Sequence, residues 1–305
     1  MSSFAATIPQ RAFARYLIVH RRSGLQPPSP GKMGRVTNAP DEDSINRKWA
    51  EMAASVDRLA ERIGDPDDFP VLAGSSLAGD DDVSHPFEVS QAVRHLVNAS
   101  VDQLHGIKTL LHETQTQHLA VGSTLARAAL ENTAAAMWIL GPRSRNLRIE
   151  RVLRWHARNY TDQRAVVGHL LPSDPTDNLE LIRTVAASRG IDPKVAASGY
   201  KITGPIEGAE EFTSIEVKFH WAVASGFAHG RPWAFGLLAQ RRLRIDDGHE
   251  VRRITPRTDL AIWLPLQAMH LLGELLRLRD RRAGLPMPPM PDGTPDSEFR
   301  LSTAR

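Results

Sequence analysis

Residues 117–140 form the segment that most restricts the fold. Between Leu119 and Leu140 only Arg127 and Glu131 are charged, and most other residues are alanine, leucine and other apolar or small types. A helix that is apolar on nearly every side is stable only where other elements surround it. A membrane span is the alternative, but each central charge would oppose insertion by roughly 2.5–3.5 kcal/mol. We therefore expect a central helix in a protein without membrane spans.

Helical periodicity recurs along most of the remaining chain. Apolar residues at intervals of three and four predict amphipathic helices, and glycine or proline residues separate them. The pattern predicts an all-α fold, a bundle of five to six long helices with a small β-hairpin insertion and disordered termini. The expected helices outside the central one cover about residues 41–63, 86–114, 144–171, 177–198, 212–229 and 258–282.

Two connecting segments depart from this pattern. Residues 65–85 are rich in glycine, aspartate, serine and proline, which predicts a loop. Residues 241–255 alternate loosely around Asp246-Asp247-Gly248. Because Asp-Gly is a frequent two-residue turn between antiparallel strands, these residues predict the hairpin.

The two ends of the chain show no pattern that could join a core. Residues 1–40 hold no acidic side chain and contain several prolines and arginines, which predicts a disordered basic leader. Residues 285–305 begin with a run rich in proline and predict a disordered tail. Residues 41–284 then remain as a single helical domain.

Composition excludes several kinds of chemistry. The 305-residue chain has no cysteine, so disulfides, zinc–thiolate sites and thiol nucleophiles are absent. This is compatible with a reducing cytoplasm, where we expect the protein. The formal net charge of +3 is too small to indicate a nucleic-acid partner by itself.

Four polar residues on two apolar helices form the candidate catalytic set. Arg127 and Glu131 lie one turn apart on the central helix, and Ser225 and His229 lie one turn apart in the segment 212–229. If the two helices pack together, these side chains meet in apolar surroundings, where pKa values shift and acid–base chemistry becomes feasible. The alternative is a buried structural network in which His229 caps its neighbours and Glu131 neutralises Arg127.

A row of arginines is the second candidate site. Arg151, Arg154 and Arg158 share one face of the helix expected at 144–171. This row is either a solvated helix face or a phosphate-binding ridge for nucleic acid. Motifs for metal and nucleotide sites, such as His-Glu-x-x-His and Gly-x-x-x-x-Gly-Lys-Ser/Thr, do not occur, so we expect no metal and no cofactor.

Arg-x-x-x-Glu at 127–131 and Ser-x-x-x-His-Gly at 225–230 resemble a group of bacterial, often actinobacterial, helical proteins. Some members of that group are similar to the HEPN superfamily of small helical RNases and their inactive relatives. HEPN nucleases carry an Arg and a His separated by four to six residues. Arg151 with His156, and Arg164 with His169, fit this spacing but lack the polar residue that usually follows the Arg.

The resemblance, which covers about residues 86–282, implies a HEPN-like protein that binds or cleaves RNA in stress or phage defence. A helical interaction or scaffold module without enzymatic activity is the alternative function. A small-molecule or DNA-binding regulator, with residues 177–205 as a helix-turn-helix, is a third. The sequence leaves open whether the protein is an enzyme and whether it forms a homodimer.

Overall fold

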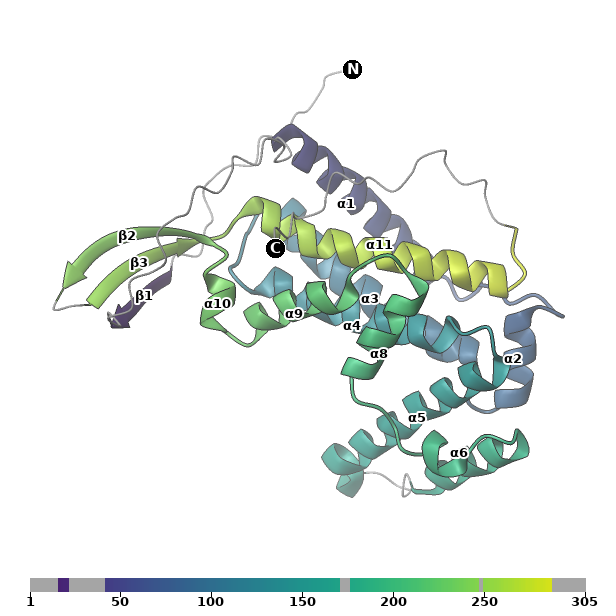
Figure 1. Cartoon of the computed structure of the whole chain (residues 1–305). Coiled ribbons are helices and arrows are strands. Elements are labelled where there is room, and N and C mark those ends of the chain that lie inside the picture. The colour runs from purple at the N-terminus through teal and green to yellow at the C-terminus, as the bar shows by residue number, and fades with distance from the viewer. Residues whose placement is uncertain (1–15, 22–41, 171–175, 247–248, 287–305) are drawn as a thin grey trace, which may run out of the picture.

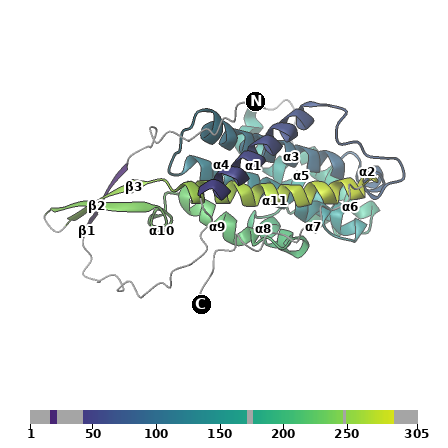
Figure 2. The ribbon, with the colours of Figure 1, turned by 90° about the horizontal axis from the view of Figure 1, so that it is seen from above.

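The computed structural model describes residues 16–21, 42–170, 176–246 and 249–286. Helices form the body of the molecule, and a small antiparallel sheet extends from one end of it (Figure 1). The view from above shows the same projection (Figure 2). The mostly all-α fold predicted from the sequence is therefore confirmed.

The centre of the body is α4 (Val121–Leu140), as its composition predicted. Four helices pack around it, namely α3 (Val89–Lys108), α8 (Thr203–Ala209), α9 (Val217–Ala228) and α11 (Thr258–Arg282). Alanines on different sides of α4, including Ala126, Ala129 and Ala134, are fully buried. Their small side chains let neighbouring helices approach from several directions, which an amphipathic helix does not allow.

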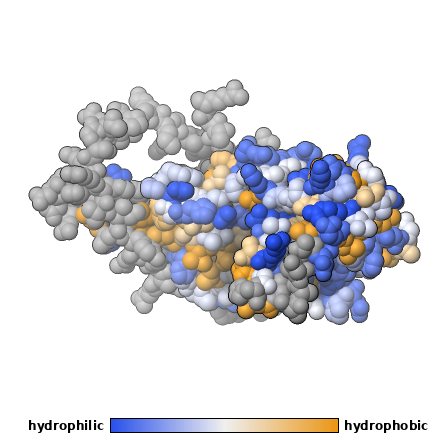
Figure 3. Space-filling view, turned by 90° about the horizontal axis from the view of Figure 1, so that it is seen from below, coloured by the Kyte–Doolittle hydropathy of each residue, from blue (hydrophilic) through white to orange (hydrophobic). Residues whose placement is uncertain are grey.

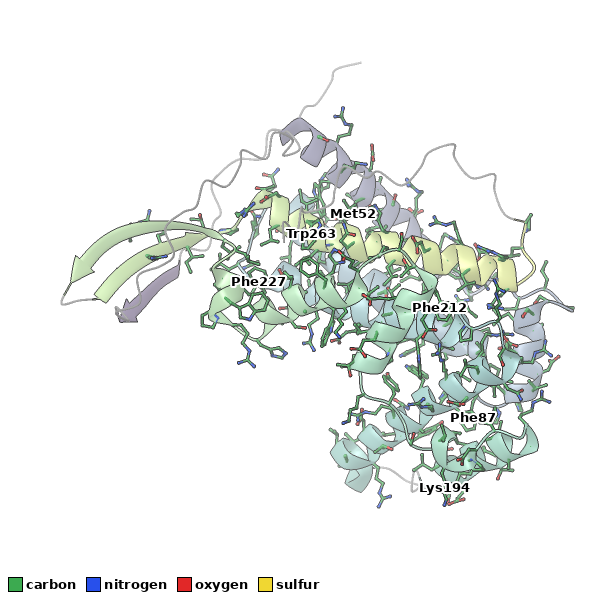
Figure 4. The ribbon with its side chains drawn as sticks, in the orientation of Figure 1. Met52, Phe87, Lys194, Phe212, Phe227 and Trp263 are labelled. Atoms are coloured by element: carbon green, nitrogen blue, oxygen red, sulfur yellow. The ribbon has the colours of Figure 1, made fainter. Side chains whose placement is uncertain are left out.

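The buried side chains form two clusters. The larger one surrounds α4 and includes residues from α1 (Glu42–Gly64), α9 and α11, such as Met52, Phe227 and Trp263 (Figure 4). The smaller one joins Phe87 to α5 (Arg145–Val167), α6 (Thr176–Ser188) and α7 (Pro193–Ala196). This second cluster forms the lower part of the body in Figures 1 and 4.

Local capping explains several helix boundaries. The hydroxyl of Ser144 accepts a hydrogen bond from the Leu147 amide at the start of α5, and Asp192 caps α7 in the same way ahead of Pro193. Gly230 has φ of 62° directly after α9 and its C-cap, where a left-handed residue ends a helix at little cost. Shorter helical segments are Thr109–Glu113, Gly168–Leu170, Glu210–Phe212 and α10 (Pro232–Phe235).

The prediction of a loop throughout residues 65–85 was wrong. Residues Ser76–Ser84 form helix α2, capped by the Ser75 hydroxyl, which accepts from the Ala78 amide at 3.1 Å. The run of aspartates in α2 has a low intrinsic helix propensity. Its helical state depends on Asp80, which is fully buried against arginines of α5. A contact between distant segments therefore overrides the local preference.

The expected hairpin forms, but a third strand joins it. Strands β2 (Ala239–Asp246) and β3 (His249–Thr255) pair antiparallel, and β1 (Tyr16–Arg21) pairs with the other edge of β3. The prediction of a disordered leader was therefore wrong for residues 16–21. The run Leu17-Ile18-Val19 suits a strand, and β3 supplies the hydrogen-bonding edge that no local pattern reveals. The remaining leader and the tail beyond residue 286 lie outside the described residues.

Within the described part of the chain, no helix combines the length and the apolar character needed to cross a bilayer.

Candidate functional site

Arg127 and Glu131 of the candidate catalytic set lie at the contact between α4 and α9. The Arg127 guanidinium and Oε1 of Glu131 are 2.9 Å apart, and both side chains are about three-quarters buried, with 25% and 23% of their surface exposed. The same Oε1 accepts a hydrogen bond of 2.6 Å from Nε1 of Trp221. The Arg127 guanidinium also lies 5.9 Å from the Trp221 ring centroid. Trp221 of α9 is thus the partner that joins this ion pair to α9.

Ser225 and His229 do not complete the expected constellation. Oγ of Ser225 is buried and has no hydrogen-bond partner among the described residues. His229 is the C-cap of α9, and its backbone amide donates to the Ser225 carbonyl at 3.0 Å. Its imidazole is exposed, with no ring contact or ion pair to the rest of the set within the described chain. The Arg127–Glu131 ion pair belongs to the structural network weighed as the alternative, whereas the His229 imidazole takes no part in that pair, and the catalytic role of the set stays a prediction.

The HEPN-like spacing does not bring Arg151 and His156 together. Residues five positions apart on an α-helix lie about 140° apart around its axis. Accordingly, the Arg151 guanidinium lies 5.1 Å from the Trp138 ring centroid of α4. His156 instead packs against Phe87 and Tyr160, with ring centroids at 5.0 and 6.2 Å. Burial lowers the His156 pKa to about 4, with only partial opposition from Glu88.

The three arginines of the candidate ridge each have a partner within the protein. Arg151 donates to the Trp138 carbonyl at 2.7 Å, and burial lowers its pKa. Arg154 donates to the Gly199 carbonyl at 3.0 Å, and Arg158 forms an ion pair with Asp162 at 2.7 Å. These contacts account for the positions of the three side chains without a phosphate ligand. The role of the three arginines in binding nucleic acid stays a prediction.

A buried ion-pair network that the sequence did not reveal joins α2 to α5. Both oxygens of Asp80 accept from Arg148, at 2.6 and 2.7 Å, and Oδ1 also accepts from Arg145 at 3.0 Å. The remaining N–H groups of Arg148 donate to the carbonyls of Pro142 and Arg143 and to the Ser76 hydroxyl. All five guanidinium donors of this buried side chain are thus used inside the protein, which indicates a structural role.

The sheet carries an unusual share of the positive charge. Its three strands contain six arginines, no lysine and two acidic residues, for a formal charge of +4, whereas the whole chain carries +3. Register places Arg241 opposite Arg253 and Arg242 opposite Arg252. Five of the six arginines lie in the predicted hairpin, and Arg21 joins them through β1. The sequence feature that could have revealed this concentration of charge is the Arg-Arg pair in each of the two predicted strands.

The described residues contain no group of three or more histidine, aspartate or glutamate side chains placed to hold a metal ion. Comparison with family models, curated proteins and solved structures finds no match to the chain. Arguments about function therefore depend on the geometry and charge of the chain itself.

Proposed function

We propose that the protein binds nucleic acid through its projecting sheet, with RNA as the expected ligand, and that it does so without cleaving the strand. The observation that carries the proposal is the +4 charge of the three strands, set against a chain total of +3. Arginine binds phosphate oxygens with paired N–H donors, and binding releases counterions from the nucleic acid. The rest of the chain is nearly neutral, so the sheet is the favoured contact surface.

The placement of the arginines supports this proposal. Adjacent residues of a strand face opposite sides of a sheet. The cross-strand pairs Arg241–Arg253 and Arg242–Arg252 occupy adjacent positions of the β2–β3 ladder, so four arginines lie within two residue pairs. The sheet extends from the helical body, which separates its arginines from the packed helices (Figures 1 and 2).

Support for binding without cleavage comes from the separation of Arg151 and His156, one of the two pairs with HEPN-like spacing. Arg151 packs on Trp138 and His156 packs on Phe87, so the two side chains face different elements. A general acid or base must reach the same scissile bond as the group that stabilises its charge. HEPN-like ancestry, a role in stress or phage defence, and a cytoplasmic location remain expectations from the sequence.

Salt-dependent binding tests the proposal and separates it from the arginine ridge. Three charges are removed from β2 in one variant, Arg241→Gln, Arg242→Gln and Arg244→Gln. The matched control removes three from the ridge, Arg151→Gln, Arg154→Gln and Arg158→Gln. We expect the β2 variant to lower the slope of log affinity against log salt by about 2 for single-stranded RNA. The slope of the ridge variant should stay near that of the parent.

Parallel titrations with single-stranded RNA, hairpin RNA and duplex DNA identify the ligand. A two-stranded ribbon fits the major groove of B-form DNA, whereas the major groove of A-form RNA is too narrow for side chains to read. If the protein binds duplex DNA tightly and neither form of RNA, the DNA-binding regulator becomes the favoured function. Equal slopes for parent and β2 variant would refute binding by the sheet, and cleavage of labelled RNA would refute a purely binding role.

A further inference from the structure

An open groove of about 500 Å³ lies where α9 begins. Its apolar part comes from Ile215, Phe219 and Ala222, and Phe219 leaves 40% of its surface exposed. Figure 3 shows apolar surface on this side of the body. A large aromatic side chain half open to water, in a concave site, favours the binding of another apolar group. We call this site the α9 groove.

The rim of the α9 groove is acidic. Glu210 and Glu216 line it, and neither forms an ion pair within the described residues. The one lysine on the rim, Lys218, has its ammonium 2.6 Å from a carboxylate oxygen of Glu207, which neutralises its charge. The groove therefore suits a segment that combines apolar side chains with positive charge.

A segment of this composition is attached close to the groove. Residues 1–15 include Phe4, Ile8 and Phe13, carry two arginines, and contain no acidic residue. The segment beyond residue 286 fits less well, because it brings three acidic side chains to an acidic rim. Charge thus favours residues 1–15 over the segment beyond residue 286.

The register of β1 places the end of residues 1–15 near the body. Tyr16 pairs with Ile254, which is buried in the main core at the base of the sheet. Nine residues later, Trp263 contacts Phe219 at a ring-centroid distance of 6.1 Å. Nine residues span at most roughly 30 Å, and fifteen span roughly 50 Å. Residues 1–15 can therefore reach the α9 groove from Tyr16.

We propose that the α9 groove binds residues 1–15 of the same chain, with aromatic and aliphatic side chains against Phe219 and arginines beside Glu210 and Glu216. The interaction is separate from nucleic-acid binding by the sheet and does not depend on it. Attachment through β1 makes the contact intramolecular, which raises the effective concentration of the segment to the millimolar range. A contact with a dissociation constant of about 1 mM is then about half populated.

Photo-crosslinking of the full chain tests this proposal. A photoreactive benzoyl-phenylalanine replaces Phe4, and mass spectrometry locates the cross-linked residues in an equal mixture of light and isotopically heavy chains. We expect cross-links between residue 4 and the start of α9 within single chains. Phe219→Ser should reduce their yield by about fivefold or more, the effect of losing modest burial. Leu181→Ser, which alters an α6 side chain of matched 39% exposure, should not.

Three results would overturn the proposal. Cross-links between light and heavy chains would assign the groove to a second copy. Cross-links mainly to other parts of the body would assign the segment elsewhere. An unchanged yield in Phe219→Ser would show that the groove does not hold the segment. Circular dichroism of each variant, compared with the parent, ensures that a lower yield does not arise from unfolding.

Discussion

Nε1 of Trp221 donates a hydrogen bond of 2.6 Å to Oε1 of Glu131, and this contact joins two helices across ninety positions of the chain. The same carboxylate oxygen is paired with Arg127 at 2.9 Å. Oε1 of Glu131 therefore takes part in an ion pair within α4 and also accepts a hydrogen bond from α9. The contact assigns Glu131 to the packing of the two helices.

A double-mutant cycle measures this contact. Glu131→Gln keeps an acceptor for the indole but removes the charge, and Trp221→Phe removes the donor. Because both ion-pair side chains are partly exposed, we expect Glu131→Gln to cost about 1–2 kcal/mol, less than a fully buried pair. The coupling between the two changes should reach about 0.5 kcal/mol or more in urea titrations. Additive effects of the two substitutions would show that the hydrogen bond contributes nothing.

The Asp80 network predicts a larger effect at a position outside the candidate site. Asp80→Asn leaves the buried Arg148 without its counter-charge, and breaking a buried pair costs about 3–5 kcal/mol. Asp82→Asn is the matched control, because Asp82 is an exposed residue of the same helix, and its effect should stay within about 0.5 kcal/mol. Chemical denaturation of both variants checks the difference. Similar midpoints for the two would contradict a structural role for the network.

Stability should fall in mildly acidic solution because of His156. Its pKa is lowered from the ordinary 6.5 to about 4 by burial, so the folded protein holds the ring neutral while the unfolded chain takes up a proton. The stability that the protein gains from keeping this ring neutral is fully present above about pH 6.5. It is lost as the pH falls towards 4. It amounts to at most about 3 kcal/mol. Burial also lowers the pKa of His220, which acts in the same direction.

Replacing the imidazole separates this effect from general acid unfolding. His156→Leu should flatten the dependence of unfolding free energy on pH between 4 and 6.5, since the imidazole with the large downward pKa shift is removed. The exposed His229 provides the control, and His229→Gln should keep the slope of the parent. If the curves of unfolding free energy against pH are parallel for the parent and His156→Leu, the pKa of His156 is not lowered in the folded state.

The third strand can be tested without shortening the chain. Proline at position 18 removes a backbone donor of β1 and is poorly tolerated in a paired strand, so Ile18→Pro should detach β1 from β3. We expect β3 amides to exchange with deuterium several-fold faster, while α4 amides keep their protection. Ile18→Val retains the strand and serves as the control. Unchanged exchange in β3 would contradict the pairing.

The sequence by itself determined the helical frame. The apolar composition of residues 119–140 was sufficient to place α4 at the centre, because a helix without a polar face has to be covered on all sides. Periodicity located α1, α3, α5 and α11 to within a few residues, and Gly230 ended α9 as expected. Asp-Gly predicted the hairpin for an equally local reason, the preference of that pair for tight turns.

Contacts between distant segments decided the rest. Helix α2 depends on the burial of Asp80 against Arg148, and β1 depends on an edge supplied by β3, so neither appears in a local pattern. The candidate site was divided in the same way. Helical spacing put Arg127 beside Glu131, but the rotation of α9 against α4 brought Trp221 to that pair and left the His229 ring in solvent. Spacing along a helix determines which side chains share a face, and only tertiary packing determines what that face contacts.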